Sequence, residues 1–175
     1  MTIKTIFLDR DGVINKEINY LYKISDFEFI NGVFKASQYF KSLNYKITII
    51  TNQSGISRGY FTEIDFQKIT KWMISQFNKN NIDILDVIHC PHLPSDFCEC
   101  RKPKPGMLFK AKTKYNIDMI NSWMIGDTEN DIQAANDAGI RNTILVKSGH
   151  KVDELNSDAK FILNSIKDIN QAIKN

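Results

Sequence analysis

The sequence has 175 residues with 42% apolar content, which suits one compact domain with a complete core. Its net charge is only +3 and no run of Lys or Arg forms a basic stripe, so a nucleic-acid partner is not expected. The three cysteines are an odd number, which does not suit a disulfide framework. The sequence shows no secretory or membrane-spanning stretch, so we expect a cytoplasmic protein, with a monomer as the default.

The first predicted element is a buried strand that ends in two acids. Residues 5–8 form an apolar run without a turn residue, and Asp9 and Asp11 follow directly. In open α/β sheets, ligands bind beyond the carboxyl ends of the strands. Because side chains alternate along an extended backbone, the two acids can point the same way. An ordinary solvated turn is the alternative at this point.

A long polar loop and an amphipathic helix come next. Residues 13–29 show no clean period and are predicted to form a loop, packed partly by Tyr20, Tyr22 and Phe27. Apolar residues recur at helical spacing from residue 31 to about 43, which predicts a helix.

The second strand also ends in polar residues. Residues 46–51 are β-branched and apolar, and hydroxyl and amide side chains with a glycine follow at 51–55. Such a strand end can hold an oxyanion, although an ordinary turn is the simpler interpretation of this segment alone. A helix over residues 62–80, with Thr62 as its N-cap, and a short strand over 85–89 are predicted next.

All three cysteines lie within residues 90–100. Cys90, His92, Cys98 and Cys100 supply the three thiolates and one imidazole of a closed, four-coordinate zinc site. Four protein ligands leave no position for water, so the predicted zinc is structural and stabilises a loop with little to bury. Free cysteines beside an incidental histidine are the alternative.

Positive charges follow this loop on a stiff segment. Arg101, Lys102 and Lys104 alternate with Pro103 and Pro105, which restrict the backbone. The rigid surroundings favour positioned cations over a solvated basic turn.

The rest of the chain continues to alternate between helices and strands. The remaining predicted elements are a helix over 105–115, a strand over 122–127, a helix over 128–139, strands over 141–146 and 160–163, and a final helix over 165–174. The whole pattern predicts a single α/β domain over residues 1–175. We expect a Rossmann-like, doubly wound, mostly parallel sheet with helices on both faces.

Several carboxylates should converge at the carboxyl edge of this sheet. Asp9, Asp11, Asp127 and Asp131 would repel one another there, by about 4 kcal/mol for each close pair at an effective dielectric constant of 20. Mg²⁺ removes that repulsion and brings phosphate oxygens with it. With Lys102 and the hydroxyl of the second strand end nearby, the edge suits phosphoryl transfer.

These residues, in this order, resemble the four motifs of the haloacid dehalogenase superfamily of aspartyl phosphatases. The resemblance implies that Asp9 attacks phosphorus to form an aspartyl-phosphate and that Asp11 acts as general acid and then as general base. It implies that Thr51 and Lys102 stabilise charge on the phosphoryl oxygens.

The same resemblance implies how the metal is held. Mg²⁺ would be bound by Asp9, Asp127 and the backbone carbonyl of Asp11. Asp131 would hold Lys102 in place or complete the outer shell of the metal.

The cysteine-rich loop and residues 51–59 are similar to the family of D-glycero-D-manno-heptose 1,7-bisphosphate 7-phosphatases. The similarity implies that the protein removes the C7 phosphate of a small-molecule phosphorylated sugar in nucleotide-activated heptose and lipopolysaccharide biosynthesis. It also implies that no sizeable cap domain is present, so that loops recognise the substrate. The implied substrate-binding residues are Asn15, Glu17, Tyr20, Asn52, Gln53, Ser54, Arg58 and Arg101.

Other functions remain alternatives at this point. Histidinol-phosphate phosphatases have a similar zinc loop, but residues 54–58 and 105–107 favour the heptose enzyme. A non-catalytic, zinc-stabilised binding module would not need the set of Asp9, Asp11 and Lys102. A DNA 3′-phosphatase is disfavoured by weak basic and aromatic interleaving and by the zinc loop.

Overall fold

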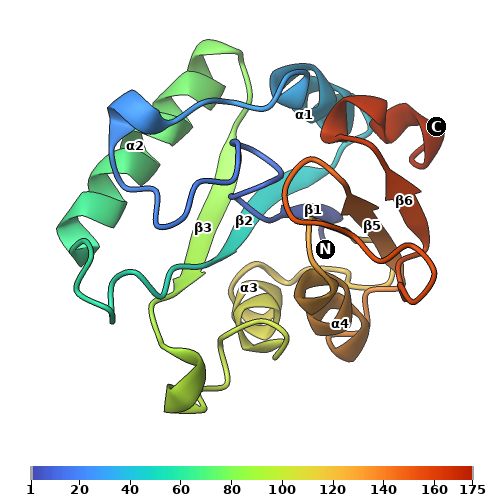
Figure 1. Cartoon of the computed structure of the whole chain (residues 1–175). Coiled ribbons are helices and arrows are strands. Elements are labelled where there is room, and N and C mark those ends of the chain that lie inside the picture. The colour runs from blue at the N-terminus through green and yellow to red at the C-terminus, as the bar shows by residue number, and fades with distance from the viewer. Residues whose placement is uncertain (1, 175) are drawn as a thin grey trace.

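The computed structural model describes residues 2–174, and these form a parallel β-sheet between two layers of helices (Figure 1). The six strands described follow the order β3-β2-β1-β4-β5-β6, and each neighbouring pair is parallel. The strands are β1 (Thr5–Leu8), β2 (Lys46–Asn52), β3 (Ile84–Cys90), β4 (Trp123–Gly126), β5 (Asn142–Val146) and β6 (Phe161–Leu163). The predicted doubly wound α/β class is therefore confirmed, including its short sixth strand.

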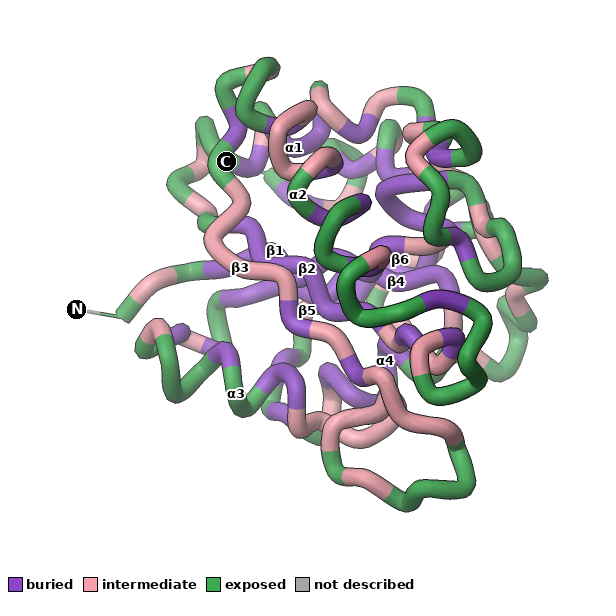
Figure 2. The backbone as a smooth tube through the Cα atoms, turned by 90° about the vertical axis from the view of Figure 1, so that its left-hand side faces the viewer, coloured by how far each residue is buried: buried purple, intermediate pink, exposed green. Residues whose placement is uncertain are grey.

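The helices cover both faces of the sheet. They are α1 (Val33–Ser42), α2 (Glu63–Lys79), α3 (Gly106–Tyr115) and α4 (Glu129–Asp137). Helices α1 and α2 lie on one face and α3 and α4 on the other (Figure 1). Figure 2 shows the strands as a buried band between these layers. None of the helices described is long and apolar enough to cross a bilayer.

Alternation along the strands divides the core into two parts. In β1, Ile6 and Leu8 belong to the apolar cluster under α1 and α2, whereas Phe7 belongs to the cluster under α3 and α4. All three side chains are fully buried, as a central strand of a parallel sheet requires. The strand therefore reaches its carboxyl end in a fixed position, and Asp9 follows it at the edge of the sheet.

The ends of the helices follow the local sequence. Thr62 caps α2 as predicted, because its hydroxyl accepts a hydrogen bond from the backbone of Asp65 while its own N–H donates to that carboxylate at 2.8 Å. Between β1 and α1, the described chain contains only the 3₁₀ helix η1 (Ile24–Asp26), so no cap domain is inserted there.

The aromatic residues of the loop before α1 pack it in part, as predicted. Phe27 is buried, but Tyr20 and Tyr22 are 41% and 36% exposed. Their rings lie against Tyr60 and Phe61, with ring centroids 4.6 and 5.6 Å apart. The phenol ring allows such partial exposure, since its hydroxyl end stays hydrated while one face packs.

The final helix predicted over residues 165–174 is present but shorter, and it is a 3₁₀ helix. Residues Ile166–Gln171 form the 3₁₀ helix η3, in which Asp168 N–H donates to Ser165 O. Ile166 and Ile169 are both buried. Because a 3₁₀ helix has three residues per turn, side chains three positions apart lie on the same face. A segment this short forms too few bonds to propagate an α-helix, and its packing against α1 determines its geometry.

Candidate active site

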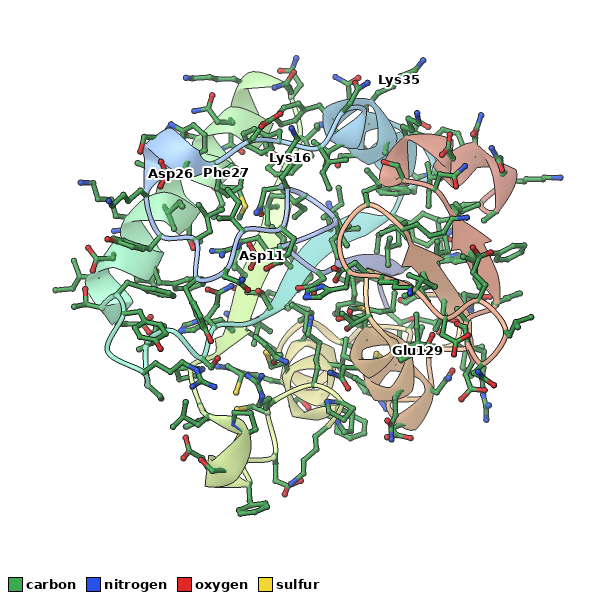
Figure 3. All side chains as sticks on the ribbon, viewed as in Figure 1. Asp11, Lys16, Asp26, Phe27, Lys35 and Glu129 are labelled. Atoms are coloured by element: carbon green, nitrogen blue, oxygen red, sulfur yellow. The ribbon has the colours of Figure 1, made fainter. Side chains whose placement is uncertain are left out.

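A cavity of about 260 Å³ opens at the carboxyl edge of the sheet. Its walls come from the ends of β1, β2 and β4, from the loop after β1, and from the segment after the cysteine cluster. Figure 3 labels Asp11 near the centre of the view, on the loop that leaves β1, and Glu129 at the start of α4. The strand ends singled out by the sequence therefore do meet around one space.

A buried lysine lies among the carboxylates of this cavity. Lys102 Nζ lies 2.9 Å from Asp9 Oδ1 and 2.6 Å from Asp131 Oδ1, and it donates to Ile50 O at 2.9 Å. Burial opposes the charge on Lys102, but Asp131 and Asp9 outweigh it and raise the pKa of the lysine. Burial, with Asp131 and Asp127 nearby, raises the pKa of Asp9, and Lys102 opposes this change.

The carboxylates exceed the positive charge available to them. Oxygens of Asp9, Asp127 and Asp131 lie within 4.8 Å of one another, and Lys102 is the cation paired with two of these acids. Burial and Asp131 raise the pKa of Asp127, whereas hydrogen bonds from His150 oppose this change. A hard divalent cation with oxygen ligands fits this set. The contact predicted for the backbone carbonyl of Asp11 stays a prediction.

Asp11, the second acid after β1, accepts hydrogen bonds from three neighbouring side chains. Both oxygens of Asp11 accept hydrogen bonds from Arg10 at 2.9–3.2 Å. Asn15 Nδ2 donates to Asp11 Oδ1 and Gln53 Nε2 to Oδ2, each at 2.9 Å. The amides of Asn15 and Gln53, expected to bind substrate, are thus engaged with Asp11, and Asn15 is fully buried away from the cavity.

The end of β2 supports the lysine as well as the cavity wall. Thr51 lines the cavity, and its hydroxyl accepts from Gln53 Nε2 at 2.8 Å. Asn52, a predicted substrate-binding residue, also lines the cavity, and its side chain pairs with the backbone N–H and C=O of Lys102, both at 3.1 Å. This double hydrogen bond fixes the segment that carries the buried lysine.

Other predicted substrate-binding residues lie in or beside the cavity. Glu17, Tyr20, Ser54 and Arg101 line it, and burial together with nearby carboxylates raises the pKa of Glu17 to about 7. Arg58 does not line it; its guanidinium lies 5.9 Å from the centre of the Tyr20 ring. Arg58 therefore lies beside a residue of the cavity wall, and its predicted contact with substrate stays a prediction.

His150 is a site residue that the sequence analysis missed. Its backbone N–H donates to Asp127 Oδ2 at 3.0 Å, and its Nδ1 lies 2.6 Å from the same oxygen, which raises the pKa of the histidine. A Cβ on Gly149 would lie 2.0 Å from this oxygen, so only glycine allows the approach. The one available signal was position, because residues 147–158 follow β5 at the same sheet edge.

The cysteine cluster forms a second candidate metal centre. The sulfur atoms of Cys90, Cys98 and Cys100 are 3.1–3.6 Å apart, and His92 Nδ1 lies 3.2 Å from Cys100 Sγ and 3.5 Å from Cys90 Sγ. Tetrahedral zinc with Zn–S bonds of about 2.3 Å would separate two sulfurs by about 3.8 Å, close to this arrangement. Burial and the adjacent thiols raise the pKa of Cys90, whereas at Cys98 burial is outweighed by hydrogen bonds, which lower its pKa to about 7.

Replacing the buried lysine should reduce stability as well as activity. In Lys102→Met, Asp9 and Asp131 lose their cation, and breaking a buried ion pair from one side costs about 3–5 kcal/mol. Urea unfolding without added Mg²⁺ measures this loss. The matched control is Lys104→Met, which removes an exposed pair with Glu99 and should cost less than about 1 kcal/mol. Equal unfolding free energies for the two variants would contradict the assigned role of the buried lysine.

Comparisons with known proteins agree with this geometry. The HAD-hydrolase-like family model matches residues 99–169. A protein from Campylobacter jejuni is 52% identical over 86% of this chain and 87% of its own length, and one from Photorhabdus laumondii is 47% identical over 90% of each. Both are named D-glycero-alpha-D-manno-heptose-1,7-bisphosphate 7-phosphatase. The crystal structure of a D,D-heptose 1,7-bisphosphate phosphatase from B. bronchiseptica, complexed with magnesium and phosphate, has a TM-score of 0.87 at 28% identity and covers 97% of both chains.

Proposed function

This chain belongs to the haloacid dehalogenase-like hydrolases and, within them, to the heptose 1,7-bisphosphate 7-phosphatases, and from that premise we propose its reaction and substrate. It is a phosphoric monoester hydrolase. Its proposed substrate is the alpha anomer of D-glycero-D-manno-heptose 1,7-bisphosphate, because relatives at 47% and 52% identity are named for that anomer, whereas the relative from Escherichia coli K12, which is named for the beta anomer, is 41% identical. The observation that carries the proposal is Asp9, 2.9 Å from a buried lysine and in the same cavity as Asp11.

The proposed reaction proceeds in two displacements at phosphorus. An oxygen of Asp9 forms a bond to phosphorus while the bond from phosphorus to O7 of the sugar breaks, and Asp11 gives its proton to the departing O7. In the second displacement Asp11 takes a proton from water, the resulting oxygen attacks phosphorus, and the bond to Asp9 breaks. Free heptose 1-phosphate and inorganic phosphate are the products, and both acids return to their first states.

The surrounding residues stabilise the charge that develops on the phosphoryl group. Lys102 and the hydroxyl of Thr51 are proposed to donate to its oxygens, while Asp131 and Asn52 keep the lysine in place. Mg²⁺, when held by Asp9, Asp127 and the Asp11 carbonyl, supplies further positive charge beside the same oxygens.

Recognition of the rest of the substrate is assigned to the cavity rim. Arg101 is proposed to bind the second phosphate, since its guanidinium can form a two-pronged contact with phosphate oxygens. Its Nη1 donates to His92 O at 3.3 Å, so the cysteine cluster orients this arginine. A structural Zn²⁺ bound by that cluster would thus support substrate binding without taking part in the chemistry. Glu17, Tyr20 and Ser54 complete the proposed sugar contacts.

We propose a cytoplasmic, monomeric enzyme of one domain over residues 1–175 that acts on a small phosphorylated sugar in nucleotide-activated heptose and lipopolysaccharide synthesis. A non-catalytic binding module would leave the arrangement of Asp9, Asp11 and Lys102 without a use.

Phosphate release from three substrates tests the proposed specificity. The value of kcat/KM should be at least about 100-fold higher for the alpha anomer of heptose 1,7-bisphosphate than for histidinol phosphate, because a site built for polar groups rejects a ligand that leaves them unpaired. The beta anomer, measured alongside, should be the poorer bisphosphate. Faster turnover of histidinol phosphate would contradict the heptose assignment.

A further inference from the structure

Arg10 is a buried cation between the two acids of the first motif. Its side chain is 1% exposed and is among the largest fully buried side chains described. Its backbone N–H donates to Asp9 Oδ1 at 2.7 Å, whereas its side chain points to Asp11. One residue therefore contacts the proposed nucleophile through its backbone and the proposed general acid through its guanidinium. A buried guanidinium is strongly unfavourable without partners, so its partners indicate its role.

The contact between Arg10 and Asp11 is a two-pronged one. Nη2 lies 2.9 Å from both carboxylate oxygens and Nε 3.2 Å from both. Nη2 also donates to Leu21 O and Gln53 Oε1, each at 3.3 Å, and the guanidinium lies 5.9 Å from the centre of the Phe66 ring. The guanidinium is thus fixed by its neighbours, and because each of the two nitrogens is equidistant from both oxygens, it holds the carboxylate across its edge.

Two amides complete this arrangement around the carboxylate. Asn15 Nδ2 and Gln53 Nε2 each donate to one oxygen of Asp11 at 2.9 Å. Arg10, Asn15 and Gln53 are 1%, 0% and 4% exposed, whereas the Asp11 side chain is 19% exposed and lines the cavity. The four residues together therefore present one oriented carboxyl group to the cavity.

We propose that Arg10 is a positioning residue, which holds Asp11 where it can give a proton to the departing oxygen and take one from water. The inference rests on the proposed function, in which Asp11 has these two tasks. It also gives Asn15 and Gln53 a supporting part in place of direct substrate contact. A misplacement of about 1 Å at such a group can lower the rate roughly 100-fold, so the rigid two-pronged contact has a kinetic consequence.

Leaving-group dependence separates this role from a merely structural one. A sugar alkoxide needs a proton as it departs, whereas p-nitrophenolate departs without one. In Arg10→Lys the charge is kept but the two-pronged contact is lost. The value of kcat/KM for heptose 1,7-bisphosphate should fall by about 100-fold or more, while that for p-nitrophenyl phosphate should fall less than about 3-fold.

A second readout reports the later task of Asp11. With p-nitrophenyl phosphate, slow activation of water should leave Asp9 phosphorylated, so Arg10→Lys should give a rapid burst of p-nitrophenol equal to the enzyme concentration. Arg141→Lys, an exposed arginine outside the site, is the matched control and should match the unaltered enzyme on both substrates. Equal losses on the two substrates, or no loss on either, would overturn the proposal.

Further variants separate a loss of folding, or a failure of the role of Asp11, from a failure of the role proposed for Arg10. Circular dichroism and thermal unfolding establish whether each Arg10 variant is folded. If Arg10→Lys does not fold, Asn15→Leu takes its place, because it removes one hydrogen-bond donor to Asp11. Its kcat/KM should also fall more for heptose 1,7-bisphosphate than for p-nitrophenyl phosphate, but by a smaller factor than in Arg10→Lys. If Asp11→Asn shows no leaving-group contrast, the proposed role of Asp11 fails instead. If Asp11→Asn loses activity mainly on heptose 1,7-bisphosphate but the Arg10 and Asn15 variants do not, the positioning role of Arg10 is refuted while the role of Asp11 stands.

Discussion

Asp9→Asn is expected to abolish phosphate release while the protein keeps its fold. The amide cannot form the bond to phosphorus on which both displacements depend, so turnover should fall by at least about 10⁴-fold. The fold should survive, because Lys102 retains Asp131 at 2.6 Å and Ile50 O at 2.9 Å. Burial raises the pKa of Asp9, which means that its negative charge is costly there, so a neutral side chain should leave thermal stability equal or higher.

Phosphate release and thermal unfolding, measured on the same preparation, check this expectation. The matched control is Asp137→Asn, an exposed aspartate at the end of α4, which should change neither quantity. Substantial residual turnover in a folded Asp9→Asn protein would exclude Asp9 as the nucleophile.

Cys98→Ser is expected to reduce stability strongly. The loop between β3 and α3 contains η2 (Pro94–Asp96), which has no buried residue, so apolar packing provides little to order it. Structural zinc contributes about 10–16 kcal/mol of binding free energy in small zinc-dependent folds, and loss of one ligand should forfeit a substantial part of this. We expect the free energy of unfolding to fall by more than about 3 kcal/mol and bound zinc to fall well below one per chain.

Metal analysis by mass spectrometry and thermal unfolding test this prediction together. Ser95→Ala changes an exposed residue of the same loop and should retain the metal. Activity should decline less than stability, since the loop acts through Arg101, which contacts His92 O, and not through the phosphorus chemistry. Unchanged zinc content in Cys98→Ser would contradict the ligand assignment.

The sequence predicted those features of the fold and site that depend on local patterns. Apolar runs ending in Asp9, Thr51 and Asp127 identified the strands, and the rule for carboxyl ends of parallel strands brought these residues together. The candidate zinc ligands were found because all three cysteines and one histidine lie within the eleven residues 90–100. In each case the signal lies within a few residues of the chain or in a rule of sheet geometry.

The features that were missed depend on partners far apart in the sequence. Gln53 and Asp11 are 42 positions apart, and nothing near Gln53 indicates that its amide is engaged with a carboxylate instead of a substrate. His150 and Asp127 are separated by 23 positions and meet only because β4 and β5 are neighbours. Tertiary packing, which no local period encodes, decides such polar contacts.

The most direct test of the account is a crystal structure of the Mg²⁺-loaded protein with beryllium fluoride, which mimics a phosphoryl group bonded to a carboxylate. We predict that beryllium is bonded to an Asp9 oxygen, with Lys102 and Thr51 donating to the fluorines and Asp11 facing the open side. An analogue bonded to any other residue, or held in the cavity without contact to Asp9, would contradict the account.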